Sequence, residues 1–201
     1  MSEIEQENPA RGTAAAVGGA VVAAAVGTAI VRRARKASAA KSGKEIERKW
    51  VLASEPPLES RACDEIRQGY VFTGVTEMRV RSMGSRYFLT IKANAGDARD
   101  EWESEIPQWA FDAVWPSTKG CRLRKRRYSW REGRQTMEVD VYAGKLKGLI
   151  VLETEFRSAR AARHFAPPEW AAGAREVTGD RAFSNQSLAR NGLTKIRRHL
   201  K

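Results

Sequence analysis

Histidine and cysteine are both scarce in this chain, each occurring only twice among 201 residues. His164 and His199 are too few and too peripheral for a histidine-based zinc or catalytic site. Cys63 and Cys121 lack the Cys-x-x-Cys spacing of metal and redox motifs, so we expect reduced thiols and a cytoplasmic location. The sequence also contains no Gly-x-x-x-x-Gly-Lys-Ser/Thr loop, which excludes a P-loop nucleotide site.

The formal net charge of +12 is concentrated at the two ends of the chain. Residues 1–44 hold 7 basic and 3 acidic residues, and residues 190–201 hold 5 basic and no acidic residues. The 145 residues between them hold 24 basic and 21 acidic residues and are nearly balanced. The overall charge is therefore no evidence for a nucleic-acid surface, and we expect no specific nucleic-acid partner.

The first 44 residues differ in composition from the rest. Residues 13–31 form an uncharged run rich in Ala, Val and Gly, long enough to cross a bilayer, and four basic residues follow closely. Such a flank would hold the rest of the chain on the cytoplasmic side, but Ala and Gly insert only marginally and glycine weakens an isolated helix. The run is thus either a single membrane anchor or a flexible soluble extension. We predict an N-terminal extension at 1–44 and one folded domain at 45–201.

The stretch Glu45-Ile46-Glu47-Arg48-Lys49 has the alternation of a β-strand with one charged face. A period of two puts Glu45, Glu47 and Lys49 on the same side of the strand. Carboxylate oxygens suit hard cations such as Mg²⁺ or Mn²⁺, and a neighbouring Lys suits a phosphate group. This face is either a solvated surface or a site for a metal-bound phosphate ester or anhydride.

Six later segments repeat the alternation, each with charge of one sign. The three basic segments carry Arg79 and Arg81, Lys92, and Lys125 and Arg127. The three acidic segments carry Glu101, Glu103 and Glu105, then Glu138 and Asp140, and then Glu153 and Glu155. Like charges directly opposite one another destabilise a sheet, so an ordinary solvated face mixes its charges. The sorted faces predict a polar-lined antiparallel barrel or tunnel, whose interior holds water, metal and a polyanion.

Three segments between or after these strands are predicted to be helical. Residues 107–115 carry aromatic residues in a pattern typical of a short helix packed on the exterior. A second helix is expected to begin after Ser158, its N-cap, and to end before Pro167-Pro168. A third is expected over residues 181–191, with Gly192 just past its end.

The ordered motifs resemble the CYTH superfamily, the triphosphate tunnel metalloenzymes, and most closely its short bacterial-type inorganic triphosphatases. The resemblance covers roughly three quarters of the chain, from Glu45 to about Asn185. The motifs that carry it are Glu45-x-Glu47-x-Lys49, Arg67-Gln68-Gly69-Tyr70, Arg79-x-Arg81, Leu89-Thr90-Ile91-Lys92, Arg99-x-Glu101-Trp102-Glu103, Lys125-x-Arg127-Tyr128, Glu138-Val139-Asp140-Val141, Glu153-x-Glu155-Phe156 and Glu176-Val177-Thr178-Gly179-Asp180.

The resemblance implies a mainly β (α+β) fold, an eight-stranded antiparallel closed β-barrel with a few flanking helices. It also implies a metal wall that binds Mg²⁺ or Mn²⁺ through Glu45, Glu47, Asp140, Glu153 and Glu155. The implied phosphate-binding residues are Lys49, Arg79, Arg81, Lys92, Lys125, Arg127 and Arg181. Lys49 and Tyr70 match a pair that the family is thought to use in activating the attacking water, which at neutral pH needs a lowered pKa or a metal-bound water.

The function that follows is divalent-metal-dependent hydrolysis of inorganic triphosphate or a related organic triphosphate. The short chain leaves little room for a nucleoside-binding insertion, which favours the inorganic substrate. Two alternatives stay open: a nucleotide-processing enzyme of the same superfamily (adenylate cyclase, nucleoside or thiamine triphosphatase), and a noncatalytic polyphosphate- or polyanion-binding module. The sequence also leaves open the oligomeric state and whether Glu101, Glu103 and Glu105 meet metal or orient the basic residues.

Overall fold

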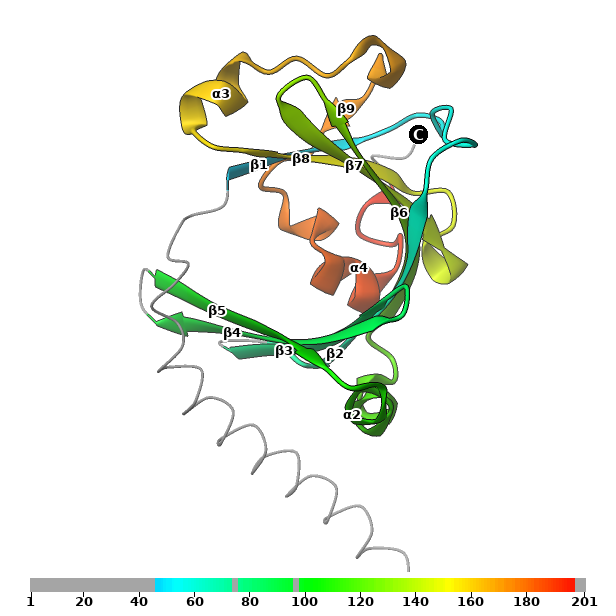
Figure 1. Ribbon diagram of the computed structural model, residues 1–201, viewed down its shortest axis with the longest axis vertical. Coiled ribbons are helices and arrows are strands. Elements are labelled where there is room, and N and C mark those ends of the chain that lie inside the picture. The colour runs from blue at the N-terminus through cyan, green and yellow to red at the C-terminus, as the bar shows by residue number, and fades with distance from the viewer. Residues whose placement is uncertain (1–45, 74–75, 96–97, 198–201) are drawn as a thin grey trace, which may run out of the picture. The chain divides into compact units, whose positions relative to one another are not determined.

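Figure 1 shows a computed structural model of the chain, which describes residues 46–73, 76–95 and 98–197. These residues belong to one compact unit, residues 43–201. The predicted extension at 1–44 with its run at 13–31, and the predicted site residue Glu45, lie outside the described residues, as does His199. In the part of the chain that is described, no helix has the length and apolar character needed to cross a membrane.

Nine antiparallel strands form a single sheet in the order β5-β4-β3-β2-β6-β7-β8-β1-β9. The strands are β1 (Ile46–Val51), β2 (Cys63–Phe72), β3 (Thr76–Met83), β4 (Arg86–Ala95), β5 (Ala98–Ile106), β6 (Arg122–Glu132), β7 (Gln135–Ala143), β8 (Ile150–Phe156) and β9 (Arg175–Glu176). The sheet curls strongly, so that β7, β8 and β1 face β2 to β5 across the concave side (Figure 1). The prediction of a mainly antiparallel β fold with few helices is confirmed.

The predicted eight-stranded closed barrel is wrong in two respects. There are nine strands, and the sheet is open: among the described residues β5 pairs only with β4, and β9 only with β1. The ninth strand has two residues, of which Glu176 lies opposite Trp50. A strand this short shows no alternation, so the sequence pattern could not reveal it.

The two faces of the sheet carry different side chains, as the alternation predicts. On β1, Trp50 packs with Leu152 and Ala171 in an apolar cluster on the convex face. The next residue, Val51, packs with Leu188 in the cluster that closes one end of the concave face. Burial of these two clusters stabilises the packing of the sheet against the segments on both of its faces, since about 25 cal/mol is gained per Å² of apolar area removed from water.

Short helices cover the sheet at three places. On the convex side, α2 (Gln108–Val114) leads into the 3₁₀ helix η3 (Trp115–Thr118) and buries Phe111 against Tyr87 and Trp115. Also outside the sheet is α3 (Ala159–His164), whose N-cap is Ser158 as predicted. Inside the curl lies α4 (Asn185–Asn191), which ends at Gly192 (Figure 1).

Three 3₁₀ turns complete the fold: η4 (Gly144–Leu146), η5 (Glu169–Ala171) and η6 (Arg181–Phe183). The helix predicted over residues 181–191 is therefore two elements, η6 and then α4, because Ser184 adopts an extended conformation and caps α4 through its hydroxyl. This break places Asn185 and Gln186 in the first turn of the helix inside the curl.

Candidate active site

The concave face carries sorted charges on two opposed sides. We call the first the acidic wall; it consists of the β1, β7 and β8 residues Glu47, Glu138, Asp140, Glu153 and Glu155. We call the second the basic wall; it consists of Arg79 and Arg81 on β3 and Lys92 on β4. At the bend between the walls, β6 contributes Lys125 and Arg127.

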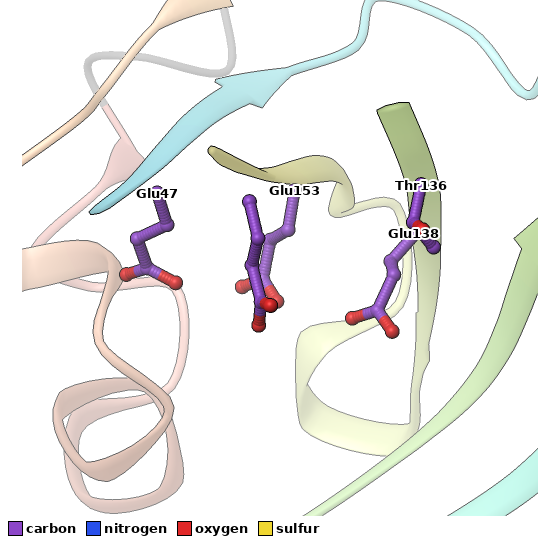
Figure 2. A pocket seen from close by; sticks show the side chains of 5 residues that line it. Glu47, Thr136, Glu138 and Glu153 are labelled. Carbon is purple, nitrogen blue, oxygen red and sulfur yellow. The ribbon is translucent and has the colours of Figure 1, made fainter. Parts of the chain in front are cut away.

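A small pocket of about 100 Å³ opens in the acidic wall. Its lining residues are Glu47, Thr136, Glu138, Glu153 and Glu155. Figure 2 shows the carboxylates of Glu47, Glu153 and Glu138, contributed by three neighbouring strands, on the same side of the sheet. Carboxylate and hydroxyl oxygens are the donors that Mg²⁺ and Mn²⁺ prefer, so the chemistry of this lining fits such an ion.

Some of the pocket carboxylates form ion pairs with neighbouring cations. Lys49 Nζ lies 2.8 Å from Glu153 Oε1 and 3.8 Å from a carboxylate oxygen of Glu47. Arg127 pairs with both Glu138 and Glu153. Within the described residues no three acidic, His or Cys side chains are already arranged to hold a metal ion, and two of the pocket carboxylates are paired with these cations instead.

Lys49 is a cation in this arrangement. Burial by itself would lower its pKa, but the carboxylates of Glu153 and Glu47 outweigh burial and raise the pKa above its ordinary value. For Glu153, burial would raise the pKa, but Lys125, Lys49 and Arg127 lower it to about 2. The Lys49–Glu153 pair is therefore charged on both sides across the physiological pH range.

The deepest ion pairs join Lys125 and Arg127 to Asp140. Asp140 is completely buried and accepts hydrogen bonds from Arg127 Nε at 2.7 Å and Nη2 at 2.6 Å, and one from Lys125 Nζ. Burial lowers the pKa of Lys125 in spite of this partner. Asp140 does not line the pocket, so in this structure it neutralises the two β6 cations rather than standing beside Glu47.

On the basic wall, the edge strand β5 supplies the counter-ions. Glu101 lies 2.6 Å from Lys92 Nζ and 3.7 Å from Arg79, whereas Glu103 lies 2.9 Å from Arg81 and 3.4 Å from Arg79. Glu103 also accepts a hydrogen bond from the Thr90 hydroxyl at 2.6 Å. In this structure both carboxylates are therefore paired with the basic residues Arg79, Arg81 and Lys92.

The hydrogen bonds of the basic wall leave specific donors unused. The Nε atoms of Arg79 and Arg81 are buried and have no hydrogen-bond partner. A buried guanidinium donor without a partner is costly, and a bound anion would satisfy it. The third β5 carboxylate, Glu105, pairs instead with the exposed Arg86 at 2.8 Å.

Tyr70 lies at the closed end of the curl. It is buried in the same apolar cluster as Leu188 of α4, and its hydroxyl accepts a hydrogen bond from Gln68 at 2.6 Å. Burial raises its pKa strongly, although Arg79 acts in the opposite direction. Burial therefore favours the neutral phenol of Tyr70, and in this structure the pKa of neither Tyr70 nor Lys49 is lowered toward the neutral range in which a general base works best.

The structure also differs in detail from the predicted set of site residues. Arg181 is the first residue of η6 and is exposed, and its guanidinium forms no ion pair with any of the described residues. Glu138 and Thr136 line the pocket although we did not predict them as ligands. A signal for both exists in the sequence, because they precede Asp140 by two and four residues and so share its face of β7.

Comparison with known proteins identifies close relatives. The inorganic triphosphatase of Nitrosomonas europaea is 42% identical over 149 residues, which cover 72% of this chain and 96% of that protein. The inorganic triphosphatase of Acetivibrio thermocellus is 32% identical over 154 residues, which cover 74% of this chain and 95% of that protein. No protein-family model matches the chain.

A solved structure supports the same relationship. The crystal structure of an inorganic triphosphatase aligns with this chain at a TM-score of 0.60 and 38% identity, covering 74% of this chain and 95% of that one. The aligned share is close to that of the two sequence relatives. From the two charged walls and from these relatives, the chain belongs to the inorganic triphosphatases of the CYTH superfamily, the triphosphate tunnel metalloenzymes.

Proposed function

We propose that this protein hydrolyses inorganic triphosphate in a reaction that depends on a divalent metal ion. One observation carries the proposal: a carboxylate-lined pocket lies beside a set of buried cations, on a chain 42% identical to an inorganic triphosphatase. Hydrolysis of a phosphoanhydride needs charge neutralisation and positioning of water, and little covalent chemistry from the protein. The basic wall and the acidic pocket offer charge neutralisation and polar groups that can position water.

We assign the metal to the acidic pocket. Glu47, Glu153 and Glu155 are the predicted ligands that line it, and we add Glu138. Mg²⁺ or Mn²⁺ would suit these oxygens and would supply positive charge against the phosphate oxygens. Asp140 would support this site from below by fixing Arg127, and Glu45 remains a predicted ligand.

We assign the phosphate chain to the cations. Arg79, Arg81 and Lys92 would bind one end of it, with the unpartnered Nε atoms of the two arginines as donors. Lys125 and Arg127 would bind phosphate oxygens near the metal, because Arg127 already reaches both Glu138 and Glu153. Arg181 remains a weaker candidate for the same role, at the mouth of the site.

We propose that Lys49 acts as a positioned cation rather than as a base. Its ammonium at 2.8 Å from Glu153 can donate a hydrogen bond to a phosphate oxygen or to the attacking water. Tyr70, kept neutral by burial, can donate its hydroxyl proton in a hydrogen bond but not remove a proton. The attacking water would then lose its proton to a carboxylate of the pocket or to the phosphate chain itself.

The proposal is tested by phosphate release from the purified full chain. Inorganic triphosphate, ATP and thiamine triphosphate are each supplied with Mg²⁺, with Mn²⁺ and with a chelator. Metal-dependent release that favours inorganic triphosphate is the expected result. Preference for ATP would indicate the nucleotide-processing alternative. Tight binding without turnover would indicate that the protein is a polyanion-binding module and not an enzyme.

We also propose a cytoplasmic location for the folded domain. Cys63 and Cys121 are both free thiols, which supports a reducing compartment. A membrane anchor at residues 13–31 and the absence of a specific nucleic-acid partner remain predictions. The small-molecule triphosphate is the partner that the charged walls support.

A further inference from the structure

Lys49 stands on a strand whose outer edge is covered by only a few residues. β1 pairs along its whole length with β8, whereas on its other side it pairs with the two-residue strand β9. At Lys49 itself the contacts to this second side are made by the residues that follow β9. The backbone of the proposed cation therefore depends on a short segment for its alignment.

Both main-chain polar groups of Lys49 are bound by that segment. Val177 N donates to Lys49 O at 2.8 Å, and Lys49 N donates to the Thr178 hydroxyl oxygen at 3.0 Å. The second bond uses a side chain where a regular strand would use a carbonyl. Its geometry is consequently set by the rotamer of Thr178.

Glu176 fixes that rotamer. The Thr178 hydroxyl donates its hydrogen to Glu176 Oε1 at 2.7 Å, which leaves the oxygen lone pairs free to accept from Lys49 N. Glu176 is in turn held by Arg48, whose Nε and Nη2 donate to its two oxygens at 2.8 and 2.6 Å. A paired guanidinium–carboxylate contact of this kind restricts orientation as well as distance.

Arg48 is itself anchored outside the sheet. Its Nη1 donates to the carbonyl oxygens of Ala162 at 2.8 Å and Phe165 at 2.7 Å, at the C-terminal end of α3. A cation is favourable at this end of a helix. The chain of contacts therefore runs from α3 through Arg48, Glu176 and Thr178 to the main chain of Lys49. It begins on the face of β1 opposite Lys49, where Arg48 lies, and it reaches Lys49 at the edge of the strand.

We propose that Arg48, Glu176 and Thr178 are positioning residues that align Lys49 for triphosphate hydrolysis. The three residues touch neither the pocket nor the basic wall, and they act through the backbone of β1. Their effect should fall on the step in which Lys49 contacts the reacting atoms, and not on binding by Arg79 and Arg81. This inference rests on the proposed function for its catalytic part, whereas the alignment of Lys49 can be measured independently.

The test compares Thr178→Val, which removes the hydroxyl, with Thr178→Ser, which keeps it. In the full chain, Thr178→Val should lower kcat for inorganic triphosphate about tenfold, the lower range for residues that support a site from outside, with KM changed less than about twofold. Thr178→Ser should restore kcat to within about twofold of the wild type. Thr73→Val is the matched control, because Thr73 also accepts a side-chain hydrogen bond, from Arg190, away from Lys49.

Amide hydrogen exchange at Lys49, measured by NMR, separates the two levels of the inference. Exchange should be fast in Thr178→Val and slow in the wild type, Thr178→Ser and Thr73→Val. Unchanged protection, or a normal kcat in Thr178→Val, would overturn the positioning role. An inactive wild type with the expected exchange pattern would instead refute the proposed function, together with the catalytic part of this inference, and would leave the alignment of Lys49 established.

Discussion

The two walls of the concave face neutralise their charges in different ways. On the side of the bend, the carboxylates are deep: Asp140 is 0% exposed and Glu153 11% exposed, and their cations Lys125 and Arg127 are 2% and 15% exposed. On the basic wall, the counter-ions Glu101 and Glu103 come from an edge strand and are 38% and 33% exposed. Buried pairs are strongly destabilising to break, whereas exposed pairs contribute little. The same kind of contact should therefore matter more for folding on the side of the bend, and should mainly orient the basic side chains on the basic wall.

The largest effect should come from breaking the deepest pair. Asp140→Asn would leave Lys125 and Arg127 buried with less negative charge, and we expect the free energy of unfolding to fall by about 3 kcal/mol or more. Urea denaturation measures this loss. Glu101→Gln on the basic wall is the comparison, with an expected loss below about 1 kcal/mol. Equal losses in the two variants would remove the distinction between the walls.

The second prediction concerns the mouth of the acidic pocket. Glu47 is 54% exposed, so Glu47→Ala should leave the free energy of unfolding nearly unchanged. It should lower metal-dependent phosphate release about a hundredfold or more, because a metal ligand is lost. Release is measured over a range of Mg²⁺ and Mn²⁺ concentrations. A fully active Glu47→Ala protein would refute the assignment of this wall to the metal.

A third prediction tests the basic wall as a binding surface. Arg81→Ala removes one of the two buried Nε donors that lack a partner. Triphosphate should then bind about tenfold more weakly or worse, since a hydrogen bond to a charged group contributes about 1.5–3 kcal/mol. Isothermal titration without metal reports the affinity. Unaltered affinity would show that the phosphate chain does not reach β3.

The smallest effect concerns pH and Glu103. Burial would raise its pKa, but the Thr90 hydroxyl and the guanidinium groups of Arg81 and Arg79 lower it below the ordinary value. A lowered pKa stabilises the fold above the unfolded value of about 4.3, and this contribution is lost as the pH falls toward the folded value. Glu103→Gln should therefore cost up to about 1 kcal/mol at pH 7 and progressively less below about pH 4.3. A cost that is constant from pH 7 to pH 3 would contradict the ion pair.

The sequence predicted which face each charged residue occupies, because a strand alternates with a fixed period of two. Glu47 and Lys49 illustrate this, since their side chains lie 3.8 Å apart on the same face of β1, as predicted. The same period carries no information on how deeply each side chain on that face is buried. Asp140 and Glu47 were therefore predicted as equivalent ligands, although one is buried beneath the site and the other lies at its mouth.

Features that depend on long-range contacts were missed. The strand β9 has two residues and exists only because β1 offers it an edge. The pKa of Lys49 depends on Glu153, 104 positions later in the chain, so its protonation could not be predicted from the local motif. The open sheet is a further case, because the charge pattern of each strand is the same whether or not the last strands meet.

The open edge of the sheet has a consequence for the width of the site. In a closed barrel the number of strands and their stagger fix the diameter, and a change of width would break main-chain hydrogen bonds. Here no ladder joins β5 to β9 among the described residues, so the twist of the sheet can change the separation of the walls while every strand pair stays intact. The distance between the walls is then set by the curl of the sheet through β2, β6 and β7, and we expect a guest of a different length to be accommodated by bending rather than by separating strands.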